Sequence, residues 1–129
     1  MHQFRIVLVF FLVLAFSTQR VQAQEQDKTQ SKQYYDLAKE MVSAPRAVDD
    51  ARELMVIAAN FDTTNLMANF EAGYMYIHTI DKELAEKFLN RVYRQQPTYR
   101  FDLEYWIGRS YQYGMKFEMA IDFYNRYKN

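Results

Sequence analysis

The sequence predicts an all-α fold of three antiparallel helical hairpins that follow a signal peptide, and three observations support it. The first is a thirty-five-residue repeat of a small residue, an aromatic residue, an alanine and a large residue, spaced by three, nine and four: Gly73, Tyr76, Ala85 and Leu89, then Gly108, Tyr111, Ala120 and Tyr124. The second is an apolar period of three and four residues along the chain, which is typical of helices. The third is that 129 residues include only three Gly and two Pro, and no alternating strand pattern.

The first hairpin is a weaker copy of the other two. Ala38 lies thirty-five residues before Gly73, and Ala51 lies thirty-four residues before Ala85. A period of this length is typical of stacked helical hairpins, whose neighbours bury a common core. We expect the small residue of each first helix to meet a small residue of the second, so that the two helices approach closely while large residues fill the space between hairpins.

Residues 1–23 have the pattern of a secretory signal peptide. Arg5 precedes an unbroken apolar run, residues 6–16, and a polar stretch then ends in Val21-Gln22-Ala23. A charged start, an apolar middle and a small-x-small end are the parts of such a leader, whereas a bilayer span needs about 20 apolar residues. We therefore expect export and a mature chain that begins near Gln24, with an uncleaved anchor as the alternative.

The charge balance argues against two classes of partner. The full chain has 16 basic and 16 acidic residues, and loss of the leader removes Arg5 and Arg20 but no acid, which leaves 14 and 16. Binding to nucleic acid or to an anionic membrane surface needs a net basic face. The sequence has no Cys, and an exported helical domain can be stable without disulfides if its core is large enough.

The mature chain divides into a polar lead-in and a helical domain. Residues 24–31 are polar and are expected to be flexible, and residues 32–129 form the repeat domain. Pro45 is placed to begin the second helix, Asp81 to cap the fourth, and Gly114 to end the fifth. The third, fifth and sixth helices are expected at about residues 65–78, 99–113 and 117–127, with capping residues in the turn 60–64.

The pattern Gly-x-x-Tyr, then Ala, then a large residue, then Pro97, resembles the tetratricopeptide repeat (TPR). In that family Gly-x-x-Tyr lies in the first helix, Ala opens the core face of the second, and Pro often closes the repeat. The resemblance covers residues 32–129 and implies a superhelix that binds ligands on its concave surface. The first repeat departs from the pattern, with Ala38 for Gly and Met41 for Tyr, and Tyr127 stands where a small residue is usual.

The resemblance implies a binding groove lined by the first helix of each hairpin. Its lining positions are Lys32, Tyr35, Lys39 and Val42, then Met67, Phe70, Tyr74 and Ile77, then Asp102, Tyr105, Arg109 and Gln112. Such a groove, aromatic at its centre and basic at its ends, suits an extended or helical peptide with an apolar anchor and an acidic group. Simple packing of Phe70 and Tyr74 on adjacent hairpins is the alternative.

The last helix is apolar on more than one face. A terminal repeat normally ends with a polar outer side, and an apolar patch there indicates an interface. We expect an open-end interface, at which the molecule pairs with itself or the chain continues as a longer protein: Phe117, Ile121, Tyr124 and Tyr127.

A second resemblance concerns the whole chain. A leader followed by "NFEAGYMYI" and "YWIGRSYQYGMKFEMAIDFYNRY" is similar to the N-terminal TPR region of OmpA-family cell-envelope proteins of Bacteroidetes. In those proteins a β-propeller-like region and a peptidoglycan-binding domain follow. Neither is present in these 129 residues, so only a scaffold role is implied.

The residues offer little for catalysis. His78 is the one histidine outside the leader, and with no Cys a metal site or a nucleophilic pair has few candidates. No Gly-rich phosphate loop is present, and the paired acids Asp49/Glu53 and Glu83/Glu86 are expected on solvated helix faces. We expect no catalytic, metal-binding or cofactor-binding residue.

These observations predict a non-enzymatic protein–protein interaction scaffold of the cell envelope, in the periplasm and associated with the outer membrane through a partner. One alternative is the truncated front part of a larger OmpA-type protein. Another is a small-ligand binder or enzyme that uses a Tyr-rich helical pocket, which would need a convergent polar cluster.

Overall fold

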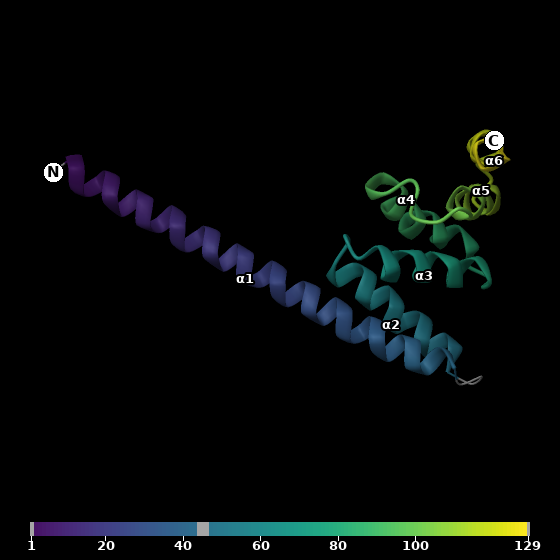
Figure 1. The fold of residues 1–129 in the computed structure, drawn as a ribbon, viewed down its shortest axis with the longest axis horizontal. Coiled ribbons are helices and arrows are strands. Elements are labelled where there is room, and N and C mark those ends of the chain that lie inside the picture. The colour runs from purple at the N-terminus through teal and green to yellow at the C-terminus, as the bar shows by residue number, and fades with distance from the viewer. Residues whose placement is uncertain (1, 44–46, 129) are drawn as a thin grey trace.

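The computed structural model describes the backbone of residues 2–43 and 47–128, and the side chains from residue 19 onward within those ranges. This part of the chain contains only helices and their connections, which confirms the all-α prediction (Figure 1). Pro45, the predicted start of the second helix, lies outside the described residues. The helices are α1 His2–Val42, α2 Val48–Phe61, α3 Leu66–Ile77, the 3-10 helix η1 Lys82–Leu84, α4 Ala85–Gln95, α5 Leu103–Tyr113 and α6 Phe117–Lys128.

Consecutive helices pair as antiparallel hairpins: α1 with α2, α3 with α4, and α5 with α6. In the first pair, Tyr34 stacks on Phe61 at the far end of α2, with ring centroids 5.5 Å apart. Each hairpin also packs on the next one, as α2 lies against α3 and α4 against α5. The fold is therefore a row of helical hairpins with a repeat-like arrangement (Figure 1).

The two glycines of the repeat occupy equivalent positions. A Cβ atom added to Gly73 would lie 2.6 Å from Leu89 Cγ, and one added to Gly108 would lie 2.6 Å from Tyr124 Cε1. Both contacts join a residue to the one sixteen positions later. The close approach was predicted with a small residue as the partner, but the residue that faces each glycine is the large one. The backbone carbonyl oxygen of Ala85 also lies close, at 3.3 Å from the Cβ atom added to Gly73.

The core lies where successive hairpins meet. One buried cluster joins α3 to α6 and a second joins α1 to α4, and Tyr76 packs against both. The repeat alanines are all inside: Ala38, Ala51 and Ala85 are 0% exposed and Ala120 is 3% exposed. The small residues of the pattern therefore allow close helix packing in all three hairpins.

The N-terminal part of α1 projects from the body as a single helix (Figure 1). The sequence predicted a flexible stretch over residues 24–31, whereas the structure continues the helix through it, because no Gly or Pro interrupts α1. Packing begins at Ser31, which is fully buried and donates to the carbonyl oxygen of Ala58 at 2.8 Å. Among the described residues, no helix is long and apolar enough to cross a membrane.

The helix ends differ in detail from the predicted ones. Asn65 caps α3, since its side chain accepts from the backbone N–H of Ala68 at 3.0 Å. Asp81 makes no such bond, and η1 precedes α4. Helix α5 begins at Leu103 rather than near residue 99 and ends before Gly114 as predicted. However, the left-handed residue after it is Met115, at φ 58°, so Gly114 is not required for that turn.

Candidate partner-binding surface

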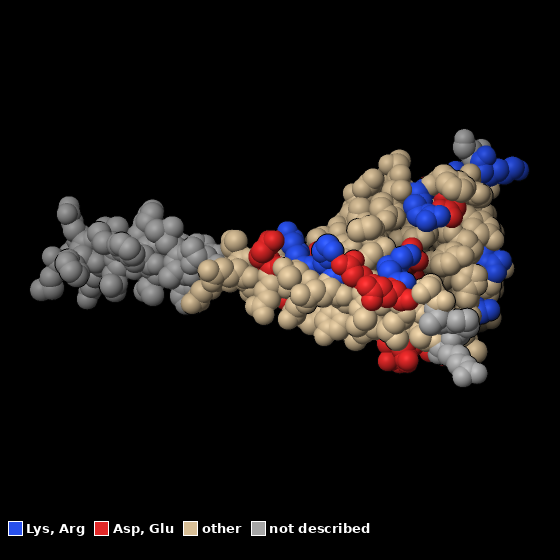
Figure 2. Space-filling view, turned by 60° about the horizontal axis from the view of Figure 1, so that its bottom comes forward, with Lys and Arg blue, Asp and Glu red and all other residues tan. Residues whose placement is uncertain are grey.

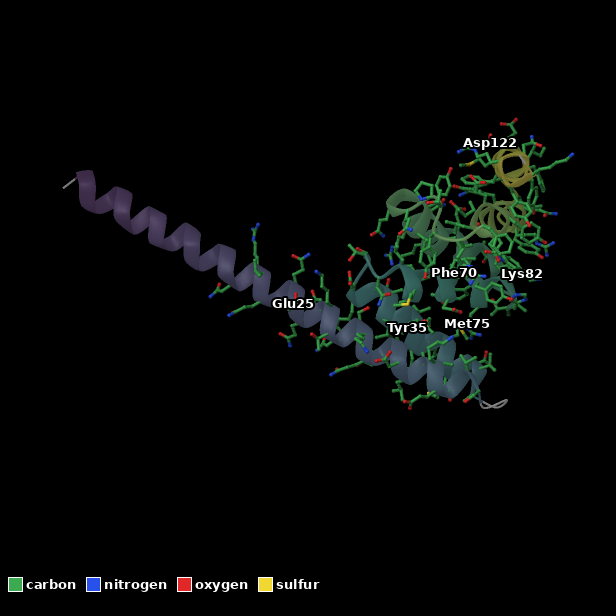
Figure 3. All side chains as sticks on the ribbon, in the orientation of Figure 1. Glu25, Tyr35, Phe70, Met75, Lys82 and Asp122 are labelled. Atoms are coloured by element: carbon green, nitrogen blue, oxygen red, sulfur yellow. The ribbon has the colours of Figure 1, made fainter. Side chains whose placement is uncertain are left out.

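The predicted groove residues lie on α1, α3 and α5, and we call their common side the first-helix face. The structure connects its three parts. Lys39 of α1 lies 4.0 Å from the Glu71 carboxylate of α3, and the ring of Tyr74 on α3 lies 4.9 Å from that of Trp106 on α5. In Figure 3, Tyr35 lies where α1 has joined the body, whereas Glu25 lies on the projecting part. The three first helices therefore share one surface.

Two of the predicted lining residues are core residues. Phe70 and Ile77 are each 3% exposed and belong to the cluster that joins α3 to α6. The Phe70 ring packs against Tyr99, at 6.0 Å between centroids, and the Arg100 guanidinium lies over it at 4.5 Å. The packing alternative is therefore the correct one for Phe70, because Tyr99 and Arg100 in the turn before α5 cover its ring. Ile77 is buried in the same cluster.

The outer predicted positions lie apart from the centre of the face. Lys32 is exposed and pairs with Asp36 on its own helix at 2.5 Å. Met67 is 52% exposed near the start of α3, and Val42 is exposed at the end of α1. These residues widen the face without contributing to the aromatic contacts at its centre.

Trp106 is the central residue that the sequence did not single out. Its ring meets those of Tyr74 and Tyr105 at 4.9 Å each, and that of His78 at 6.0 Å. We call Tyr74, His78, Tyr105 and Trp106 the aromatic row. The one available signal was that the single Trp of the chain lies two residues before a repeat glycine. Its indole N–H donates to Asp102 at 2.9 Å, which fixes the ring.

Asp102 holds the N-terminal end of α5 by accepting from two groups. Arg100 donates to it through Nε at 2.9 Å and Nη2 at 3.3 Å, in addition to the bond from Trp106. Burial raises the pKa of Asp102, but the hydrogen bonds from Arg100 and Trp106 outweigh that effect, so the pKa lies below its ordinary value. Asp102 thus acts on the face by positioning Trp106.

Glu71 gives the α1 side of the face a negative group. Burial, and then the Glu71 carboxylate, raise the pKa of the Tyr35 hydroxyl. The same two causes, in the same order, raise the pKa of Tyr99, and Arg100 opposes them. The sequence prediction missed Glu71, although it stands two residues before Gly73 as Trp106 stands two before Gly108.

Two cavities open on either side of Tyr74. The larger, about 590 Å³, lies between the first two hairpins, and its walls include Val42, Arg52 and His78. The smaller, about 290 Å³, lies between the second and third hairpins, and its walls include Phe70, Glu71 and Trp106. Because Tyr74 lines both, the surface is hollowed on each side of the aromatic row, as a binding site for side chains requires.

The C-terminal part of the face is formed by Arg109 and Gln112. Arg109 donates from Nη2 to the hydroxyl of Tyr113, while its Nε is buried and has no hydrogen-bond partner among the described residues. Gln112 accepts from the hydroxyl of Tyr124 at 2.7 Å. The predicted groove therefore ends in a polar region rich in Tyr.

The predicted open-end residues divide into two groups. Phe117 and Ile121 are 55% and 59% exposed on the outer side of α6. Tyr124 instead packs on Gly108 inside the hairpin, and Tyr127 stacks on Tyr105 at 5.5 Å while remaining 43% exposed. Tyr124 therefore belongs to the α5–α6 contact, because the missing side chain of Gly108 leaves room for its ring.

Charges of both signs are interspersed on the molecular face drawn in Figure 2. Ion pairs among the described residues include Arg126 with Asp122 at 2.6 Å and Lys116 with Glu86 at 2.7 Å. This face therefore has no broad field of one sign. Among the described residues, no group of three or more His, Cys, Asp or Glu is arranged to hold a metal ion.

Comparison with known proteins gives no relative for this chain. A scan against protein-family models found no match, and searches of curated proteins and of solved structures also found none.

Proposed function

We propose that the chain is an exported, non-enzymatic scaffold of TPR type, which binds a segment of another protein across the first-helix face. The hollowed aromatic row is the observation that supports this proposal most directly. Half-buried aromatic rings beside cavities can provide anchoring contacts for a peptide, since large side chains buried in pockets contribute most of the binding energy in protein interfaces. The leader-like residues 1–23 and the resemblance to envelope proteins support a periplasmic location.

Capture of partners from an envelope extract tests the proposal. The full chain is used as bait beside two variants. Tyr74→Ala opens the centre of the row, and Phe101→Ala removes an aromatic ring that is 85% exposed and lines neither cavity beside Tyr74. The expected result is one identified protein that the wild type and Phe101→Ala retain equally. Tyr74→Ala should bind that protein with about tenfold lower affinity, or ~1.4 kcal/mol. Equal retention by both variants, with unchanged thermal melting, would remove the first-helix face from the proposal.

Pairing of two copies through α6 is a second candidate, favoured by the exposure of Phe117 and Ile121. Glu118 lies in the first turn of α6, and Arg126 and Lys128 lie in its last turn. In an antiparallel contact between two α6 helices, the acidic end of one would meet the basic end of the other. Light scattering of the wild type and of Ile121→Asp tests this candidate. The wild type is measured at 100 µM, a concentration on the order of the dissociation constant of a weak dimer, and a monomer there contradicts the candidate.

A further inference from the structure

Arg109 differs from the half-buried Arg52 and Arg91 because one of its guanidinium nitrogens is buried without an acceptor among the described residues. Arg52 pairs with Asp49 at 2.6 Å, and Arg91 donates to the carbonyl oxygen of Ala59 at 3.1 Å and to two asparagines. Arg109 donates only to the neutral hydroxyl of Tyr113, and its Nε has no partner among the described residues. A charged group with a buried, unpaired donor is costly, and no described carboxylate pairs with Arg109, so a ligand carboxylate at the half-buried guanidinium would neutralise a charge that the fold leaves uncompensated.

A second cation approaches the same ring. Lys82 Nζ lies 4.6 Å from the centre of the Tyr113 ring, and the Arg109 guanidinium lies 5.0 Å from it. Helix η1, which contains Lys82, packs beside α5, and Figure 3 labels Lys82 there. Neither cation forms an ion pair with a described carboxylate, although Glu104 and Glu118 are present on α5 and α6. We call Lys82, Arg109 and Tyr113 the cation pair site.

We infer that the cation pair site binds a carboxylate side chain of an acidic segment in the partner protein. Two positive groups beside one aromatic ring leave a net positive charge in a half-buried place, and an Asp or Glu side chain neutralises it. A guanidinium binds a carboxylate through two parallel hydrogen bonds, which gives direction as well as strength. The inference rests on the proposed function and specifies which feature of the partner the surface selects.

The position of the site favours a peptide over a small anion. Tyr105 lies one helical turn before Arg109 and is in ring contact with Trp106, so the aromatic row continues to the cation pair site. A segment lying along α5 would place an apolar side chain on the row and an acidic one at Arg109. A free phosphate or carboxylate would use the cations alone.

The inference is tested with two immobilised pools of nine-residue peptides. One pool has Glu at the central position and the other has Gln, and all other positions are random. Purified full-length chain is expected to bind the Glu pool about tenfold more strongly, because a charged hydrogen bond contributes about 1.5–3 kcal/mol. Arg109→Gln should abolish the preference and Lys82→Gln should reduce it about threefold, by analogy with a screened pair. Arg94→Gln, which removes one exposed positive charge from α4, is the matched control and should keep the full preference.

Equal binding of the two pools, or an equal loss in Arg94→Gln and Arg109→Gln, would overturn the inference. So would a preference that is removed completely by 10 mM inorganic phosphate, which is about tenfold above a weak site's dissociation constant. The last result would identify a small-anion site. If Arg109→Gln does not fold by circular dichroism, Arg109→Lys keeps the charge and should retain part of the preference. The two proposals can be told apart by experiment. If the wild type, Arg109→Gln and Lys82→Gln capture the same partner equally well, only this inference is rejected. If the chain prefers the Glu pool but captures no partner from the extract, only the proposed function is rejected.

Discussion

The second and third hairpins use the same close contact in different surroundings. In α3–α4, which packs between the other two hairpins, Gly73 faces Leu89, and Leu89 is 0% exposed. In α5–α6, Gly108 faces Tyr124, a half-buried ring that reaches Gln112 with its hydroxyl. The repeat therefore sets how closely the two helices approach, while the neighbouring hairpins set how rigidly the large residue is held. The variants below compare the two hairpins on that basis.

The largest expected difference comes from removing the large residue. Leu89→Ala leaves a cavity inside the core and should lower the free energy of unfolding by about 3–4 kcal/mol. Tyr124→Ala opens space at the surface, which water can fill, and should cost about 1–2 kcal/mol. Urea unfolding followed by circular dichroism measures both. Equal costs would show that the third hairpin is as tightly packed as the second.

Adding a methyl group at each repeat glycine tests the same comparison. Gly73→Ala should cost about 2 kcal/mol, because the fully buried Leu89 cannot move from the added methyl group. Gly108→Ala should lie within about 1 kcal/mol of the wild type, since the ring of Tyr124 can shift toward solvent and Ala favours the helix. In a Leu89→Ala background, Gly73→Ala should no longer destabilise the fold. Persistence of its cost there would assign the effect to the backbone of Ala85.

Much of this framework could be predicted from sequence, because the repeat spacing constrains backbone contacts. The thirty-five-residue period placed Gly73 and Gly108 correctly, and the apolar period located the helices. The prediction that a small residue faces each glycine holds only in part. The Ala85 backbone does approach Gly73, but the nearest side chains are Leu89 and Tyr124, because a pattern of small residues does not show which side chain fills the space. The continuous α1 was also missed, because polar composition over residues 24–31 does not distinguish an exposed helix from a flexible segment.

The candidate site was predicted less well. Family positions located Tyr74, Tyr105 and Arg109, but they treated Phe70 as surface, although the turn before α5 covers it. Trp106 stayed unnoticed because it is not one of the family lining positions, although it follows Asp102 by four residues, a helical spacing that brings the two side chains together. Contacts made by irregular turns follow no period, so a repeat cannot predict them.

The two hairpins also differ in what holds their first turn, and pH distinguishes them. Asn65 of α3 is neutral, whereas Asp102 of α5 is an acid with a pKa below its ordinary value of 3.8. The Asp102 contribution is therefore complete above that value and is lost as pH falls through the lower folded-state pKa. Asp102→Asn should cost about 1 kcal/mol at pH 7, and the cost should shrink as pH falls below 3.8 toward 2. Unfolding measured from pH 2 to 7 checks this, and a constant difference between variant and wild type contradicts it.

The smallest expected effect concerns the ion pair that joins the two hairpins. Lys116, directly before α6, lies 2.7 Å from Glu86 of α4, and the hydrogen bond that it donates to the Glu86 carboxylate raises the pKa of its ammonium group. Both side chains are partly exposed, so Lys116→Met should cost less than about 1 kcal/mol in low salt and close to nothing in 1 M NaCl, where screening is strong. Because the folded-state pKa is raised, the contribution is present below the ordinary lysine pKa and disappears as pH rises above it. Thermal melting in 20 mM and 1 M NaCl measures the effect, because the screening length falls severalfold over that range. A cost that salt does not change would mean that Lys116 stabilises the junction through the contact of its ammonium with the Tyr111 ring, at 5.7 Å, instead.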